Sequence, residues 1–157
     1  MNRPVARGAL IQGRLTTRLG GAGLLPFALA LVIAWAAPPD WQAWAVGAFL
    51  FYSAVILSFL GGVQWGVAMS LDTPDDPAFA SRMLRSMLPS LIAWPALLLP
   101  DLAATAVLMA GYLLIHAYEC RPASRARLPD WYRALRRYLT LCVVSAHALM
   151  LLRLMIG

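Results

Sequence analysis

The longest uncharged run in this sequence, Trp41 to Leu71, is the feature that most constrains the fold. A helix that crosses the hydrocarbon core of a bilayer, roughly 30 Å thick, needs about 20 mostly apolar residues. Thirty-one consecutive uncharged residues exceed that length. The whole chain is 61% hydrophobic and 13% charged, whereas a soluble domain is about half apolar and a quarter charged. The sequence therefore predicts an integral membrane protein.

Four further apolar runs extend this pattern. Together they predict an all-α bundle of five transmembrane helices in a single membrane domain, residues 1–157. The third and fourth runs are short, but one merged helix would be about 50 Å long, and Pro100-Asp101 is a turn signal. We therefore expect a helical hairpin there. The predicted spans cover residues 19–37, 43–71, 84–100, 102–118 and 138–156.

The arginines predict the orientation of the spans. All thirteen basic residues are arginines, and twelve of them lie in segments 1–18, 72–85 and 119–137. These segments share one side of the membrane, and the positive-inside rule makes that side cytoplasmic. Arg153 is the exception, and its long side chain can reach the outer interface. We expect a bacterial cytoplasmic (inner) membrane protein with its N-terminus in the cytoplasm and its C-terminus outside.

The first apolar run has a second interpretation, as a cleaved signal peptide. Arginines precede it and small residues end it, as in secretory signals. The run has 19 uncharged residues, which is long for a signal core and enough to span a bilayer. We therefore expect the first run to be a membrane span.

The net charge of +6 bears on the partners of the chain. Nucleic-acid binding requires a basic face on a folded soluble domain. Here the arginines flank apolar runs, which favours the anionic headgroups of the lipid bilayer as a partner and excludes nucleic acid.

The loop 119–137 is predicted to hold an amphipathic interfacial helix before the last span. Apolar residues recur there at helical spacing with arginines between them, and a proline suits the first turn of a helix. Such a helix lies at the inner interface and continues into the last span. The interfacial motif comprises Pro129, Trp131, Tyr132, Arg133 and Arg136.

The second span contains a motif of small residues around one amide. Small residues recur at every fourth position from Ala54 to Ser70, which places a strip of them along one side of a helix. The strip predicts a close helix–helix contact. The alternative is a helix broken at Gly61-Gly62, whose freed backbone groups line a substrate path with the amide of Gln64. The candidate packing or functional motif comprises Ser58, Gly61, Gly62, Gln64, Trp65 and Gly66.

One polar cluster is the nearest approach to a chemical site. His116 lies three residues before Glu119 and four before Cys120, so all three can share one helix face. Such a group can bind a metal ion or relay a proton. A closed zinc site needs a fourth ligand, which is missing here. We expect an interfacial histidine with its neighbouring carboxylate in water, and we predict no metal ion and no cofactor.

Three segments resemble a family of small integral membrane proteins, domain of unknown function 3429. They are Leu19 to Phe27 (LGGAGLLPF), Ile56 to Ala68 (ILSFLGGVQWGVA) and Leu128 to Thr140 (LPDWYRALRRYLT), with a softer likeness at Leu88 to Trp94 (LPSLIAW). The segments bracket nearly the whole chain. The resemblance implies a shared fold and supplies no established activity. It also implies that the first span belongs to the mature protein.

The sequence leaves three classes of function open. No hydrolase, nucleotide-binding or dinucleotide fingerprint is present, which favours a protein that is not an enzyme. The preferred hypothesis is an accessory or assembly component of a larger membrane complex, bound to other membrane subunits or to a second copy of itself. One alternative is a small oligomeric transporter or channel with a polar site at Gln64. The other is an intramembrane metal or redox protein that uses His116, Glu119 and Cys120.

Overall fold

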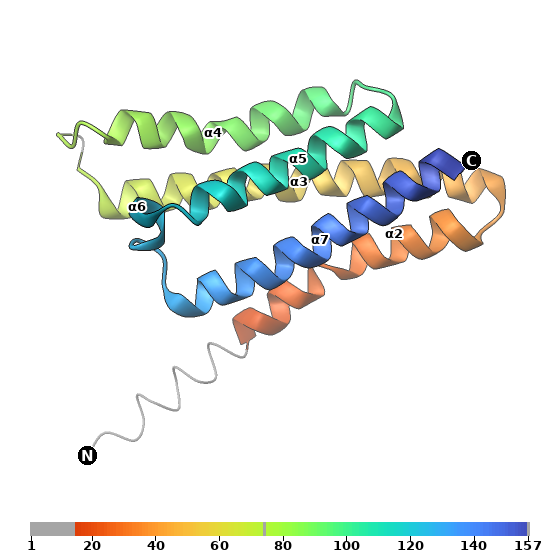
Figure 1. Ribbon diagram of the computed structural model, residues 1–157, viewed down its shortest axis with the longest axis horizontal. Helices are drawn as coiled ribbons and strands as arrows, with labels where there is room; N and C mark the ends of the chain where they lie inside the picture. Colours follow the sequence, from red (N-terminus) through yellow and green to blue (C-terminus); the bar gives the residue numbers. More distant parts are fainter. Residues whose placement is uncertain (1–14, 74, 157) are drawn as a thin grey trace, which may run out of the picture.

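The protein is a bundle of long helices that lie side by side along one axis in the computed structural model, which describes residues 15–73 and 75–156 (Figure 1). These residues contain no strand, which confirms the predicted all-α class. A first helical segment, residues 15–22, leads through a turn into the second helix. The helices are α2 (Leu25–Ala36), α3 (Pro39–Leu71), α4 (Phe79–Ala96), α5 (Asp101–Glu119), the short α6 (Pro122–Arg125) and α7 (Asp130–Ile156).

Among the described residues, four helical segments are long and apolar enough to cross a membrane, so the predicted number of five is approximate. They are Leu15–Ala36, Pro39–Leu71, Asp101–Glu119 and Asp130–Ile156. The 18-residue helix α4 is less apolar because Arg82, Arg85 and several serines interrupt it. It nevertheless packs against α3 and α5 as a full member of the bundle. The last span has the expected form, since the interfacial segment and the span make one continuous helix, α7.

The two ends of the bundle differ in their loops. One end holds the 72–78 loop, α6 and the start of α7, and we call it the arginine-rich end (Figure 1). The other end holds the α2–α3 and α4–α5 turns and the last residues of α7. The α4–α5 turn closes over residues 97–100, and Pro100 precedes the first residue of α5. Of the arginines counted in the predicted orientation, Arg3, Arg7 and Arg14 lie outside the described residues.

The first span bends where its sequence contains glycine and proline. The backbone N–H of Leu24 donates to the carbonyl of Gly21, a tighter bond than the helical one. Pro26 has no backbone N–H, so the carbonyl four residues earlier loses its helical partner. The Tyr52 hydroxyl of α3 donates to the Gly23 carbonyl at 2.9 Å. This bond fixes the bend against the centre of the bundle.

Helix α4 approaches α3 closely at Gly61, and not at the Gly62 and Gly66 pair that the period-four spacing predicts. A Cβ atom added at Gly61 would lie 2.5 Å from the carbonyl oxygen of Ser86 and 3.4 Å from the Pro89 ring. Added at Gly62 or Gly66, it would meet no described atom within 4 Å. A period of four drifts around a helix of 3.6 residues per turn, so the strip leaves the buried face.

The helix break predicted as an alternative at Gly61-Gly62 is also absent, because α3 is one helix of 33 residues. The packing of α4 on Gly61 holds the backbone in place there. The centre of the bundle is filled by large side chains from α2, α3, α5 and α7, with Phe27, Phe49, Leu57, Leu108 and Tyr112 almost fully buried.

Large apolar side chains also cover the outside of the bundle. They include Phe51, Phe59, Leu91, Leu114 and Leu141, each more than half exposed. Such a surface would associate in water, whereas hydrocarbon solvates it. The fold therefore places apolar side chains both in its core and where lipid would contact it.

Candidate functional site

Three polar side chains meet between α3, α5 and α7 near the arginine-rich end. The Gln64 amide donates to Glu119 Oε1 at 2.8 Å, and Arg136 Nε lies 3.1 Å from Glu119 Oε2. Glu119 is 5% exposed and Arg136 is 6% exposed. The sequence analysis assigned these residues to three separate motifs, and the fold joins them into one cluster.

The helical spacing explains why these residues face inward. On α5, Leu108 and Ile115 are buried, and Glu119 follows Ile115 by four residues on the same face. On α7, Arg136 precedes the buried Thr140 by four residues and Val143 by seven. Each polar residue therefore continues the buried stripe of its helix toward the arginine-rich end.

The electrostatics of this cluster follow from its burial. A buried carboxylate is stable only when charges and hydrogen bonds compensate it. Glu119 has both, from Arg136 and from the Gln64 amide. Arg136 is less completely satisfied, because its Nη2 atom is buried and has no hydrogen-bond partner among the described residues.

The predicted cluster of His116, Glu119 and Cys120 does not form as a unit. His116 Nε2 lies 3.7 Å from Cys120 Sγ, while the Glu119 carboxylate turns to Arg136. The prediction of this carboxylate in water is wrong, because Arg136 draws it into the bundle. Within residues 15–73 and 75–156, no three histidine, cysteine or acidic side chains are grouped as a metal site requires.

Some side chains of the predicted interfacial motif are exposed on the outside of the bundle, and others are buried inside it. Trp131 is 53% exposed, as expected of an interfacial residue, and Arg133 forms an ion pair with Asp130. Pro129 directly precedes α7. Arg136 belongs to the same predicted motif, but its side chain is buried in the bundle. Its position on the buried stripe of α7, opposite Glu119, outweighs its charge.

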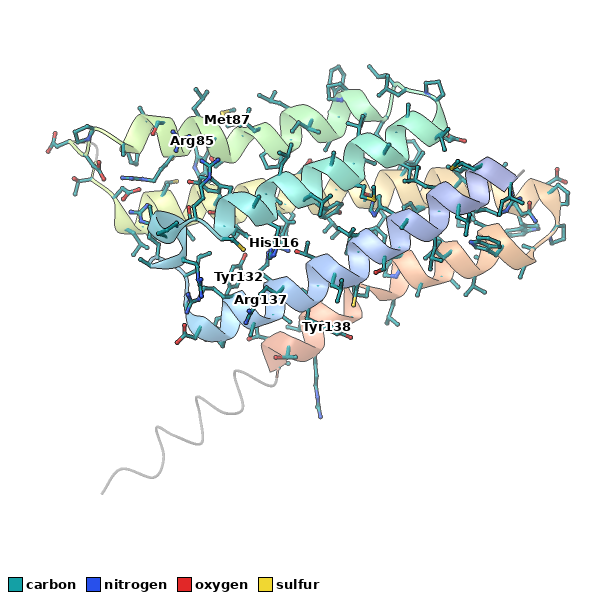
Figure 2. The ribbon with its side chains drawn as sticks, viewed as in Figure 1. Arg85, Met87, His116, Tyr132, Arg137 and Tyr138 are labelled. Atoms are coloured by element: carbon teal, nitrogen blue, oxygen red, sulfur yellow. The ribbon has the colours of Figure 1, made fainter. Side chains whose placement is uncertain are left out.

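A cavity of about 320 Å³ opens beside this cluster, and we call it the arginine cavity. His116 of α5 and Tyr132 of α7 lie near one another here (Figure 2). Its charged lining includes four arginines and two carboxylates. The complete lining consists of His116, Glu119, Cys120, Arg125, Leu128, Asp130, Tyr132, Arg133, Arg136 and Arg137.

The remaining residues of the α3 motif face away from this cavity. Trp65 is partly exposed and its Nε1 atom donates to Met69 Sδ, while the Ser70 hydroxyl donates to the Gly66 carbonyl. Ser58 is half-buried. Of the six residues singled out on α3, Gln64 reaches the polar cluster and Gly61 makes the α4 contact.

A second buried polar group lies in the middle of the bundle, and the sequence analysis missed it. His147 Nδ1 lies 2.8 Å from the Val143 carbonyl, and His147 Nε2 lies 2.8 Å from Ser53 Oγ. The Tyr112 hydroxyl donates to the Ser53 carbonyl at 2.8 Å. Since a carbonyl only accepts, Nδ1 carries a proton. The structure buries Ser53, Tyr112 and His147, each on the inward face of its helix.

Ion pairs close the arginine-rich end of the bundle. The Asp72 side chain is 2% exposed and contacts both Arg82, 2.7 Å from its Nε, and Arg127. Asp76 pairs with Arg82 and accepts the backbone N–H of Ala78. That backbone bond, with the hydrogen bond and charge of Arg82, lowers the pKa of Asp76 below its usual value. These pairs tie the 72–78 loop to α4 and to the segment after α6.

Arg153 closes the opposite end of the bundle, where its side chain is half-buried and bonded to other helices. Its Nε atom donates to the Ala34 carbonyl at 2.9 Å, and its Nη2 atom donates to Gln42. Ala34 lies in the last turn of α2, where carbonyls lack helical partners and a cation is favoured. The side chain therefore caps α2 and joins three helices.

These features define a class of protein. Long apolar helices carry their polar side chains toward one another and their large apolar side chains outward. The protein is an all-α integral membrane protein with several membrane-spanning helices.

The comparison with known proteins gives the family. The chain belongs to the family described as protein of unknown function (DUF3429), which it matches over residues 13–152. It is 38% identical over 129 residues to transmembrane protein 69 of Xenopus tropicalis, covering 80% of this chain and 49% of that protein. It is 33% identical over 129 residues to transmembrane protein 69 of Mus musculus, covering 76% and 48%. The chain spans about half the length of these curated relatives. No solved structure matches it.

Proposed function

We propose that this protein is a non-enzymatic component of a larger membrane complex and that the outward face of α3 binds a neighbouring transmembrane helix. The main observation in support is the exposed pair Gly62 and Gly66, where an added Cβ would meet no described atom within 4 Å. Glycine in a helix interior costs about 0.5–1 kcal/mol relative to alanine. The described contacts within the chain give no reason for that cost at these two positions.

A second helix supplies such a reason. Glycines four residues apart let two helix backbones approach closely in a membrane. Bulky exposed side chains lie one, two and three turns before Gly62 on the same helix, at Phe59, Val55 and Phe51. The glycines therefore leave the helix backbone less covered than it is at these bulkier side chains. The partner in this proposal is another membrane subunit or a second copy of this chain.

The test of this proposal is what copurifies with the full chain after gentle detergent extraction. We expect a stable partner, which a Gly62→Leu/Gly66→Leu variant loses because the added side chains keep the two helix backbones apart. An Ala106→Leu variant on exposed α5 is the matched control and should retain the partner. A monomer with no partner, from native membranes, would refute the proposal.

We also propose that the arginine-rich end faces the cytoplasm of a bacterial cell in its cytoplasmic membrane. The charge pattern supports this orientation, because Arg82, Arg85 and the arginines of residues 121–137 gather at one end of the bundle. A reporter fused after Gly157 should then map outside the cytoplasm. A cytoplasmic signal from that fusion would overturn this orientation.

One observation favours a transporter or channel as the second candidate. A cavity of about 300 Å³ between α3, α4 and α5 is lined by Gln64, Arg85 and Arg121 together with apolar side chains. The amide of Gln64 is engaged by Glu119, and the uninterrupted α3 supplies no freed backbone groups. Both facts make this candidate weaker. Solute flux in proteoliposomes that a Gln64→Leu variant abolishes, with the fold intact, would establish it over the first.

A further inference from the structure

We propose that the arginine cavity binds the phosphate group of an anionic membrane lipid, whose acyl chain occupies a neighbouring apolar cavity that shares Arg136 with it. This site is separate from the outward face of α3, because it lies between α5 and the start of α7. The proposal therefore does not depend on the docking of a partner helix.

The first support is a set of buried polar atoms without partners. Arg136 Nη2, Arg133 Nε, the Tyr132 hydroxyl and His116 Nδ1 are buried and make no hydrogen bond to any described residue. All four residues line the arginine cavity. Buried polar groups are nearly always hydrogen-bonded in native proteins. Arg136 in particular is 6% exposed, so bulk water does not surround its guanidinium.

The second support is the charge of the cavity. Two of its four arginines form ion pairs with its two carboxylates, Arg136 with Glu119 and Arg133 with Asp130. In the part of the chain that the structure describes, Arg125 and Arg137 form no ion pair. The lining therefore retains an excess of two positive charges. Guanidinium groups bind phosphate oxygens through paired, charge-assisted hydrogen bonds.

The third support is the apolar cavity, which has a volume of about 200 Å³. Its lining includes Phe27, Leu60, Leu139 and Val143, with Arg136 and Thr140 as its polar members on α7. The Thr140 hydroxyl is also buried without a partner among described residues. Such a hydroxyl can donate to the ester carbonyl that joins an acyl chain to its headgroup.

The two cavities follow one another along α7. The arginine cavity is lined by α7 residues up to Arg137, and the apolar cavity by α7 residues from Arg136 to Val143. Tyr132, Arg136, Leu139 and Val143 are spaced to share one helix face. A polar cavity and an apolar cavity thus adjoin Arg136 in succession along α7, which is the order of phosphate and acyl chain in a lipid. A soluble phosphate would use only the first.

The experiment is native mass spectrometry of the full chain, titrated with phosphatidylglycerol, with phosphatidylcholine and with inorganic phosphate. We expect phosphatidylglycerol to bind most tightly. In an Arg133→Gln/Arg137→Gln variant its affinity should fall by about tenfold or more, the loss expected when one charge-assisted hydrogen bond is removed. Arg136 is left intact because its loss would leave the buried Glu119 carboxylate without a cation.

The matched control is an Arg85→Gln/Arg121→Gln variant, which removes the same charge from the cavity between α4 and α5. Its affinity for phosphatidylglycerol should change by less than about twofold. Circular dichroism and size-exclusion profiles must match the parent for both variants. Equal losses in the two variants would mean general charge attraction and overturn the site. Inorganic phosphate binding as tightly as the lipid, or no preference over phosphatidylcholine, would also overturn it.

Discussion

The two buried polar clusters of this bundle differ in how completely their hydrogen bonds are satisfied. In the middle, both ring nitrogens of His147 and the hydroxyl of Tyr112 have partners within 2.8 Å. At the arginine-rich end, Glu119 is paired, but Arg136 and Tyr132 keep buried atoms without partners among the described residues. The aromatic rings of Phe27, Phe49 and Tyr112 pack around His147, whereas cavities adjoin Arg136.

This difference separates a structural role from a binding role. A fully bonded polar cluster fixes the relative position of helices and has no unused donor for a ligand. A partly bonded cluster beside a cavity offers donors that a ligand can satisfy. The middle cluster therefore fixes the relative positions of α3, α5 and α7. The end cluster also fixes helix positions through its ion pair, and in addition it offers hydrogen-bond donors to a ligand. Four predictions test this contrast.

The largest effect is expected at the buried ion pair. An Arg136→Leu substitution leaves the Glu119 charge buried without its cation, and the expected loss of unfolding free energy is about 3–5 kcal/mol. Reversible unfolding in mixed detergent measures it. The adjacent, exposed Arg137→Leu should change stability by less than about 0.5 kcal/mol. The Glu119→Leu/Arg136→Leu double variant should recover most of the loss, and failure to recover would mean that the pair is not the cause.

The middle cluster should respond to a single hydroxyl. A Ser53→Ala substitution removes the donor to His147 Nε2 and leaves a buried nitrogen unpaired, at a cost of about 1–3 kcal/mol. Ser145 on α7 is exposed, so Ser145→Ala is the control and should be nearly neutral. The same unfolding assay compares them. A neutral Ser53→Ala would contradict the view that this cluster fastens the helices.

Substitutions at two adjacent glycines test the packing of α3 against α4. Gly61→Ala forces a methyl group against the Ser86 carbonyl, and overpacking of this kind costs about 1–3 kcal/mol. Gly62→Ala makes the same chemical change where no described atom is near. The higher helix propensity of alanine should then raise the unfolding free energy of this variant by up to about 1 kcal/mol. Opposite signs for the two variants are the expected result. Equal effects would contradict the assigned helix rotation.

The smallest effect is expected from the surface pair at the arginine-rich end. The pKa of Asp76 is lowered in the folded protein, so the ionised carboxylate stabilises the fold at pH values above its unfolded pKa of about 3.9. That contribution is lost as the pH falls through the folded pKa. The melting temperature should therefore fall slightly more between pH 5 and pH 3 for the parent than for Asp76→Asn. Identical pH profiles would show that the pair contributes nothing.

Particular residues show how far the sequence alone could reach. The uncharged run from Trp41 to Leu71 predicted the long helix α3, and Pro100-Asp101 predicted a turn that the α4–α5 hairpin contains. The fold adds distant partners to the polar residues that the sequence singled out. His116, Glu119 and Cys120 are close in sequence, yet the carboxylate of Glu119 binds Gln64, 55 residues away, and Arg136, 17 residues away.

The charge pattern did not show which groups hold two of the arginines. Arg136 was expected in an interfacial helix, and Arg153 was expected to reach the outer interface. The protein itself holds both side chains, one through Glu119 and the other through the Ala34 carbonyl and Gln42. Extending the buried stripes of α5 and α7 toward the arginine-rich end would have found the first of these contacts.

The sequence by itself determined that this chain is an all-α membrane protein, because hydrophobic length and charge are properties of each segment alone. It did not determine which face of each helix is buried. Rotation and pairing depend on the fit between helices, and only the tertiary structure decided that Gly61 packs on α4 while Gly62 faces out. The same fit brought Gln64, Glu119 and Arg136 together, since a buried charge must find its partner wherever the neighbouring helix presents it.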